Sequence, residues 1–187
     1  MPMTRSLVLD AMRSLLADNT HGLNAQLAAT REAYGIDEPV WFDWSADAAH
    51  SVFYGGVSDQ AARRTRLAER ATLRMSTGSS VWTGETRNVK WSGIIEGRLQ
   101  FLVRMSHEDR EEDSIEDYDI IEQYIGWIED AVIEVFARRD IDWGDLGVIY
   151  ARPPDCPEPP DAVLYADGWE QAIPMRLGFR VDANYES

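Results

Sequence analysis

The sequence predicts an α+β domain in which helices pack on one face of a mainly antiparallel sheet. Two patterns carry this prediction. Apolar residues alternate along 89–105 and 172–182, which is typical of half-buried strands, whereas they step by four and three along 114–138, which is typical of an amphipathic helix. The chain has 187 residues, 44% of them hydrophobic, so we expect one domain over 1–187 with a sizeable core.

The N-terminal segment predicts two helices and a strand. An amphipathic opening helix of about four turns is indicated by apolar residues at helical spacing, namely Leu7, Val8, Met12, Leu15 and Leu16. Leu23 and Leu27 suggest a second, short helix, which Gly35 ends. The sequence "EPVWFDW", residues 38–44, then predicts a first strand.

Residues 45–85 are predicted as an inserted loop or arm. Residues 60–75 fit either a helix or an extended hairpin arm, and 76–86, "STGSSVWTGET", at the end of the stretch, fit a loop tip. Five arginines lie in this stretch, and the four that we single out as candidate intersubunit or lumen-facing charges are Arg63, Arg64, Arg66 and Arg70. A long irregular excursion inside a compact domain is often functional.

Residues 89–105 predict a β-hairpin with one buried face. Apolar residues alternate on both sides of "EGR", residues 96–98, which we interpret as the turn. The inward positions are Val89, Trp91, Gly93 and Ile95 before it, and Leu99, Phe101, Val103 and Met105 after it.

The C-terminal half predicts a long helix over about 114–138 and two further strands. The core-facing stripe of the helix consists of Ile121, Ile125, Ile128, Val132 and Val135. The strands are expected at 147–151, "GVIYA", and 172–182, "AIPMRLGFRVD", with a Pro-rich loop at about 152–160 between them. We expect the helix stripe to pack beneath residues of the sheet such as Phe101 and Phe179.

Charge and motifs exclude several function classes. The formal net charge is -15, which argues against an ordinary nucleic-acid binder because such proteins present a basic surface to phosphates. The three histidines are far apart in sequence, and no phosphate-binding or nucleophile motif is present, so we expect no enzyme, no cofactor and no metal. Cys156 is the single cysteine, interpreted as an inert loop thiol. No apolar run is long enough to span a membrane, and we expect a protein made in the cytoplasm.

The stretch "HEDREEDSIEDYD", residues 107–119, holds eight carboxylates in thirteen positions. One interpretation is a solvated helix start, because anions favour the helix N-terminus and Ser114 can cap it. A Ca²⁺ loop fits less well, since the central glycine and the closing glutamate are missing. The third interpretation is a surface for a partner or a DNA channel, with Glu111, Glu112, Asp113, Glu116 and Asp117 as the candidate residues.

Trp82 is a candidate interface aromatic. It lies in the loop-like sequence "SSVWTG", so its indole either anchors the chain to a neighbouring subunit or closes its own loop.

Four stretches in this order resemble the tail terminator and head–tail neck proteins of long-tailed bacteriophages. They are "LVLDAMRSLLADNTHGLNAQLAA", "VKWSGIIEGRLQFLVRM", "DYDIIEQYIGWIEDAVIEVFARR" and "AIPMRLGFRVDANYES". The resemblance is one of layout: an amphipathic opening helix, a long hairpin, a helix across the sheet and an extended strand near the C-terminus. The arginine-bearing excursion and the Pro-rich loop depart from that layout.

The resemblance implies a structural virion protein, assembled in the host cytoplasm. Its subunits would form a homo-oligomeric ring, commonly a hexamer, that contacts tail-tube and head-completion proteins. DNA would pass through the ring without specific binding, which suits an acidic lumen that repels phosphates. The alternative from the residues themselves is an acidic DNA-mimic inhibitor that binds a DNA-binding protein, although the arginines of 63–70 would spoil a phosphate-like surface.

Overall fold

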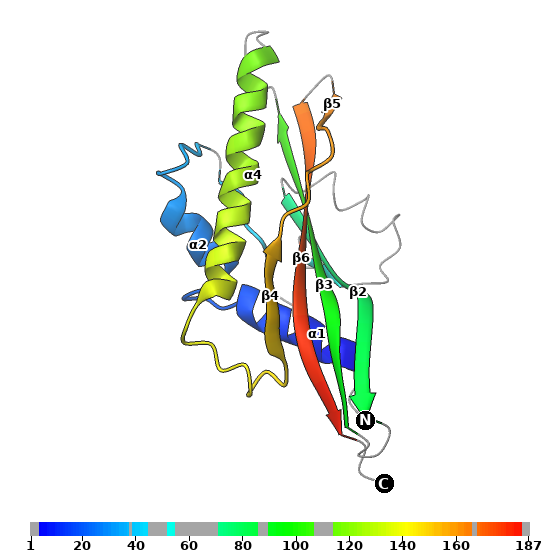
Figure 1. The fold of residues 1–187 in the computed structure, drawn as a ribbon. Coiled ribbons are helices and arrows are strands. Elements are labelled where there is room, and N and C mark those ends of the chain that lie inside the picture. The colour runs from blue at the N-terminus through cyan, green and yellow to red at the C-terminus, as the bar shows by residue number, and fades with distance from the viewer. Residues whose placement is uncertain are drawn as a thin grey trace.

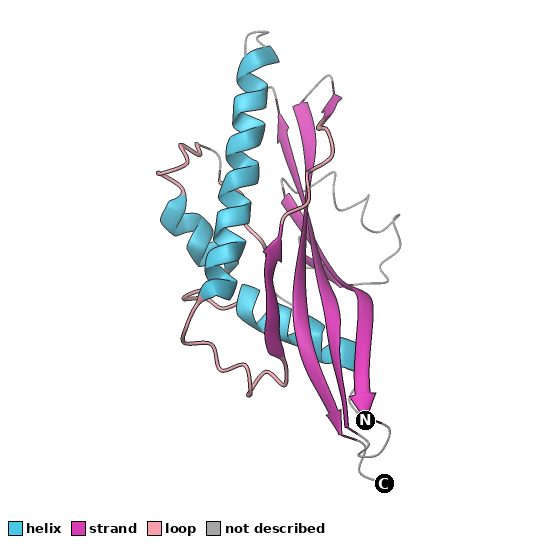
Figure 2. Cartoon of the chain, in the orientation of Figure 1, coloured by secondary structure: helices cyan, strands magenta, loops and turns pink. Residues whose placement is uncertain are grey.

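The computed structural model describes seven stretches of the chain, residues 4–37, 39–44, 52–54, 71–85, 90–106, 114–165 and 168–184. The elements in chain order are α1 (Thr4–Leu16), α2 (Leu23–Thr30), β1 (Val52–Tyr54), β2 (Ala71–Glu85), β3 (Lys90–Ser106), α4 (Ser114–Ala137), β4 (Ile149–Asp155), β5 (Val163–Tyr165) and β6 (Gly168–Asn184). Helices and strands segregate into two layers, with the helices on one side of the sheet (Figures 1 and 2).

The sheet has six strands in the order β1-β2-β3-β6-β4, and β5 also pairs with β6. β1 runs parallel to β2, whereas the other pairs are antiparallel. Strands β2 and β3 form a long hairpin, and α1 and α4 cover one face of the sheet (Figure 1). The predicted α+β class, with a mainly antiparallel sheet, a long hairpin, an N-terminal helix and one long helix packed on the sheet, is confirmed.

The turn predicted at "EGR" is wrong, because β3 runs without interruption through residues 96–98. It pairs with β6 from Lys90↔Asn184 to Ser106↔Gly168. Gly97 marks a close approach: a Cβ there would lie 2.6 Å from the Met12 sulfur and 2.9 Å from the Phe179 ring. A glycine inside a strand pattern signals either a turn or such a contact, and here the contact of β3 with α1 requires it.

The loop tip predicted at 76–86 is also wrong, because β2 continues to Glu85. The register of β2 against β3 shifts between Thr77 and Ser80, so a bulge lies where the glycine- and serine-rich sequence suggested a loop. The last residues of 60–75 belong to the same strand from Ala71 onward. Residues 45–51 and 55–70, the rest of the predicted arm apart from β1, lie outside the described residues.

The two N-terminal helices lie where they were predicted, but 39–44 do not join the sheet. The side chain of Asn24 holds this segment instead: its Nδ2 donates to the carbonyl of Phe42 at 2.7 Å, and its Oδ1 accepts from the Phe42 amide at 3.0 Å. These bonds replace the ladder that a strand neighbour would supply. Gly35, with φ +62, adopts the left-handed conformation that ends the turn after α2.

The stripe predicted on α4 is confirmed as core. Its five members are buried in one hydrophobic cluster with Phe101, Val103, Leu177 and Phe179 of the sheet. Trp127 is fully buried, and its Nε1 donates to the carbonyl of Leu27 and to Oγ1 of Thr30, both at 3.1 Å. These bonds fix α4 against α2.

The C-terminal strands are longer than predicted. β4 extends through Asp155 and thus includes the first part of the Pro-rich loop, while 156–162 have no regular structure. The short strands β1 and β5 were not predicted. None of the helices in the described stretches is long and apolar enough to cross a membrane.

Candidate functional site

The face of the sheet opposite the helices carries a concentration of arginines. Alternation along β3 and β6 turns the odd-numbered residues toward the core and the even-numbered ones outward. The outward charged residues are Arg74 on β2; Glu96, Arg98 and Arg104 on β3; Arg152 and Asp155 on β4; and Glu170, Arg176, Arg180 and Asp182 on β6. Among the side chains that the structure describes, this open face thus carries six arginines and four carboxylates, although the net charge of the chain is -15.

Some of these arginines have partners within the sheet. Arg98 pairs with Glu96, and Arg180 Nε lies 3.6 Å from Asp182 Oδ1. The guanidinium of Arg104 lies 5.4 Å from the centre of the Tyr165 ring, a cation–π distance. Among the described residues, Arg74, Arg152 and Arg176 form no ion pair. Positive charge on this face is therefore only partly neutralised.

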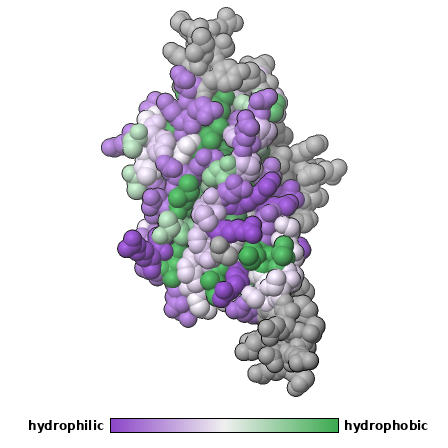
Figure 3. Space-filling model, viewed as in Figure 1, coloured by the Kyte–Doolittle hydropathy of each residue, from purple (hydrophilic) through white to green (hydrophobic). Residues whose placement is uncertain are grey.

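A groove of about 550 Å³ crosses the open face between β2 and β4. Its lining residues are Ser79, Val81, Ile94, Glu96, Arg152, Pro153, Pro154, Asp155, Arg176, Leu177 and Gly178. Figure 3 shows hydrophilic side chains in purple beside small green hydrophobic areas over the strands. The groove thus combines apolar contact with two arginines that have no ion pair in the described part of the chain, and with the carboxylates of Glu96 and Asp155.

Glycines shape this groove. A Cβ at Gly178 would lie 2.9 Å from Cβ of Arg152, so the missing side chain lets the stem of Arg152 lie across β6. On β2, Gly78 makes room for the side chains of Glu96 and Arg98, which fill the space that a Cβ would occupy. Close contact between neighbouring strands thus depends on glycine at both positions.

The outer surface of α4 has the opposite charge. The helix contains seven carboxylates and neither Lys nor Arg. Its exposed acidic side chains in the described part are Asp119, Glu122, Asp130 and Glu134. Ile133 lies among them with 37% of its surface exposed. The outer surface of α4 and the open sheet face therefore carry complementary charges.

Two acidic residues of α4 also have local structural roles. The Tyr34 hydroxyl donates to Asp130 Oδ2, and this bond to a carboxylate raises the pKa of Tyr34 to about 12. Burial raises the pKa of Glu129 from its ordinary value, and the nearby Cys156 thiol bonds to its carboxylate. Burial, and then the charge of Glu129, raise the pKa of Cys156 to about 11. A thiol with this pKa is almost entirely protonated at neutral pH, which supports the inert interpretation of Cys156.

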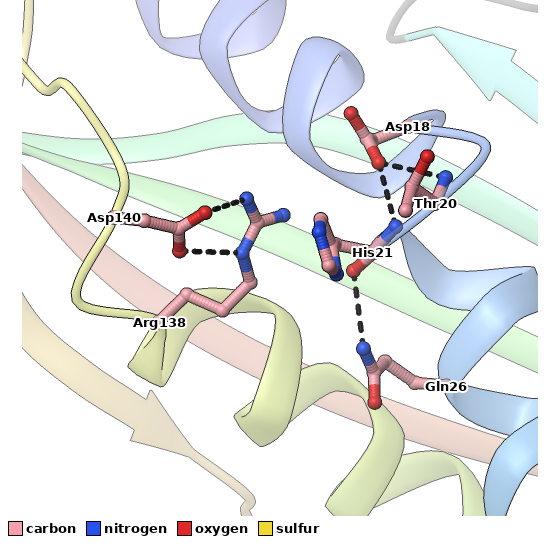
Figure 4. A network of polar contacts seen from close by, with 6 residues as sticks. All are labelled: Asp18, Thr20, His21, Gln26, Arg138 and Asp140. Carbon is pink, nitrogen blue, oxygen red and sulfur yellow. Dashed lines mark hydrogen bonds and ion pairs between the residues drawn. The ribbon is translucent and has the colours of Figure 1, made fainter.

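Polar residues of the turn after α1 and of the segment just after α4 lie near one another (Figure 4). Asp18 Oδ1 accepts from the amides of Thr20 at 2.9 Å and His21 at 2.6 Å, which lowers the pKa of Asp18. Arg138 binds Asp140 through two bonds of 3.0 and 2.8 Å, and this bonding lowers the pKa of Asp140 to about 2. Asp18 here caps backbone amides and Arg138 already holds a carboxylate, so we interpret the cluster as structural.

The structure tests few of the site residues predicted from sequence. Seven of them lie outside the described residues: Arg63, Arg64, Arg66, Arg70, Glu111, Glu112 and Asp113. Glu116 and Asp117 lie in the first turn of α4, where the backbone alone is described. The described stretches contain no group of three or more possible metal ligands.

Trp82 lies on strand β2, so its predicted loop location is wrong. It is opposite Gly93 of β3, and a Cβ on Gly93 would lie 2.5 Å from the indole ring. The indole therefore covers its own hairpin, with 37% of the residue exposed. This packing favours a role within the chain over a purely intersubunit anchor.

Sequence reasoning missed the arginines of the open face. They are scattered over four strands, and only the register brings them together. One signal was present: in "AIPMRLGFRVD" the residues between the inward-facing ones include Arg176 and Arg180. Comparisons of the chain with models of known protein families and with curated proteins gave no match.

Proposed function

We propose that this protein is a structural subunit of a homo-oligomeric ring at the head–tail junction or the tail end of a long-tailed bacteriophage. In this proposal it has no catalytic role. Its partners are further copies of itself, in a hexameric ring, and the neighbouring tail-tube and head-completion proteins. The virion is assembled in the host cytoplasm.

The observation that carries the proposal is the separation of charge between the two layers. Acidic side chains lie on the outer surface of α4, whereas arginines outnumber carboxylates on the described part of the open sheet face. A ring is built by a heterologous contact, in which one surface of a subunit meets a different surface of the next. Surfaces of opposite charge on opposite sides of one subunit suit such a contact. The α+β class is the one that the resemblance implies. The stretch matched there to the hairpin, residues 89–105, is however the single strand β3, and the long hairpin is formed by β2 and β3.

The net charge of -15 supports the second part of the proposal, that DNA passes without binding. A lumen rich in carboxylates repels phosphates, so DNA does not adhere to it. The acidic surface of α4 alone would also suit the alternative, a DNA mimic that occupies a DNA-binding protein. The arginines of the open face argue against that alternative, because a phosphate-like surface gains nothing from them.

The test is the mass of the purified protein, measured by size-exclusion chromatography with light scattering over a range of concentrations. We expect assembly above a threshold concentration and ring-shaped particles in negative-stain electron micrographs. The same sample should pass through a DNA column without retention at low salt. If the protein stays monomeric at every concentration and captures a DNA-binding enzyme, the ring is wrong and the DNA mimic is favoured.

A further inference from the structure

We propose that the groove between β2 and β4 receives the outer surface of α4 from a second copy of this chain, with Ile133 as the apolar anchor. This inference rests on the proposed ring function and deepens it, because it names the two surfaces that meet. The residues that carry it come from the groove and from the part of α4 whose side chains are described.

The groove supplies apolar contact and positive charge together. Val81 is 66% exposed, and Ile94 and Pro153 also line the groove. Arg152 and Arg176 also line the groove and form no ion pair among the described residues. The groove has two carboxylates as well: Glu96, which is paired with Arg98, and Asp155, which lies opposite Arg176 in the register. Because Glu96 is already paired, the two arginines outweigh Asp155, and an apolar side chain flanked by carboxylates suits the groove.

The outer surface of α4 has that composition. Ile133 is 37% exposed, and Glu134 follows it directly. Glu122 is exposed about three turns before Ile133 on the same side of the helix. Asp130 lies one turn before Ile133 and also accepts the hydrogen bond of Tyr34. Because α4 has no basic residue, nothing within the helix neutralises these charges.

The contact must join two copies. Within one chain, α4 packs on the core face of the sheet, whereas the groove lies on the open face. A helix cannot reach the far side of its own sheet, so each copy keeps an unused helix surface and an unused groove. Repetition of the contact closes a ring when the rotation between subunits allows it.

The experiment reverses the charge of each surface separately. In the groove variant, Arg152→Glu and Arg176→Glu are combined, and Glu retains the Cβ, Cγ and Cδ positions that lie over Gly178. In the helix variant, Glu122→Arg and Glu134→Arg are combined, since both side chains are exposed. Circular dichroism and thermal melting verify that both variants fold, and light scattering measures their mass.

We expect each variant alone to be monomeric at a concentration at which the parent assembles. An equimolar mixture should regain the mass of the parent assembly, because each reversed helix then meets a reversed groove. Association of the parent should weaken as salt rises from about 0.05 to 0.5 M, since salt screens the charge pairs.

The outcomes separate this interface from the ring itself. If the parent forms rings and both variants do so equally well, the groove–helix contact is wrong and the ring stands. If the parent forms only dimers, which the variants lose and the mixture restores, the contact stands and the ring is wrong. A parent that stays monomeric up to about 1 mM, far above the Kd of a specific interface, overturns both.

A second pair of variants tests the apolar anchor. Ile133→Asp should lower the association constant at least about tenfold, which corresponds to about 1.4 kcal/mol. Val163→Asp is the matched control, because Val163 is 51% exposed on β5, away from both surfaces, and should associate like the parent. Equal effects of the two substitutions would contradict a role for Ile133.

Discussion

The two faces of strand β3 show how differently one stretch of sequence can be used. Toward the helices, Ile95, Leu99, Phe101 and Val103 are buried, with Gly97 between them where Met12 approaches. Toward the other side, the strand presents charged, polar and apolar residues that are wholly or partly accessible. The core face holds the layers together, whereas the side chains of the open face can contact other molecules.

The largest loss of stability is expected from a substitution that creates a cavity in the core between α4 and the sheet. Ile128→Ala should lower the free energy of unfolding by about 2–5 kcal/mol, because Ile128 is fully buried in the cluster. Ile133→Ala on the outer side of the same helix should stay within about 0.5 kcal/mol. Urea denaturation of the monomeric proteins measures both. If both substitutions lower the free energy of unfolding equally, the assignment of Ile128 to the core side and Ile133 to the outer side of α4 is wrong.

Overpacking at Gly97 should have the next largest effect. Gly97→Ala should cost about 1–3 kcal/mol, because the new methyl group meets Met12 and the Phe179 ring. Gln100→Ala, on the open face of the same strand, serves as the control and should be nearly neutral. Combining Gly97→Ala with Met12→Ala in a double-mutant cycle should show coupling, since the two residues are in contact. If the two losses of unfolding free energy are strictly additive, Gly97 does not contact Met12.

A smaller effect is expected at the edge between the layers, where Glu129 of α4 meets Cys156. Burial raises the pKa of Glu129 in the folded chain. The folded state therefore binds the proton more tightly than the unfolded state, and ionisation of Glu129 reduces stability as pH rises through the folded pKa. Glu129→Gln should accordingly stabilise the fold at pH 7 relative to the parent. This gain should vanish below the ordinary pKa of glutamate.

Thermal melting of the parent and Glu129→Gln between pH 3.5 and 8 measures that difference. Glu134→Gln, at an exposed position of the same helix, is the control and should show no such trend. A gain for Glu129→Gln that grows toward low pH would contradict the assigned direction of the pKa shift.

The smallest effect is expected for a single exposed carboxylate of the acidic stretch. Glu112→Gln should change neither stability nor association measurably, because a lone surface charge is screened by salt within about 10 Å. Neutralising Glu111, Glu112, Asp113, Glu116 and Asp117 together should leave the fold intact, yet weaken association at low salt or cause retention on a DNA column. A five-fold variant that behaves as the parent does in both assays would reduce the stretch to a solvated helix start.

The core face could be predicted from sequence because burial imposes a period. Apolar residues step by two on β6 and by three or four on α4, and these patterns placed both elements within a few residues. The same reasoning failed where one residue type serves two purposes. Gly97 was interpreted as a turn residue but provides clearance for Met12, and the glycine and serine residues near Gly78 belong to a bulge in β2.

The arginines of the open face could not be predicted, because no single segment contains a periodic pattern that indicates them. Arg74, Arg98, Arg152 and Arg176 come together only through strand order and register, which depend on contacts distant in sequence. The strand predicted at 38–44 failed for a related reason. Its extended backbone finds its hydrogen-bond partner in the side chain of Asn24, which no local pattern indicates.

The uninterrupted pairing of β3 with β6 also has a mechanical consequence. Hydrogen bonds between antiparallel strands are perpendicular to the strand direction. A tension that pulls the two strands past each other along their length loads all these bonds at once, from Lys90↔Asn184 to Ser106↔Gly168. A tension that separates one end of the pair sideways loads them one after another. The sheet is therefore stiff along its strands and easily opened across them.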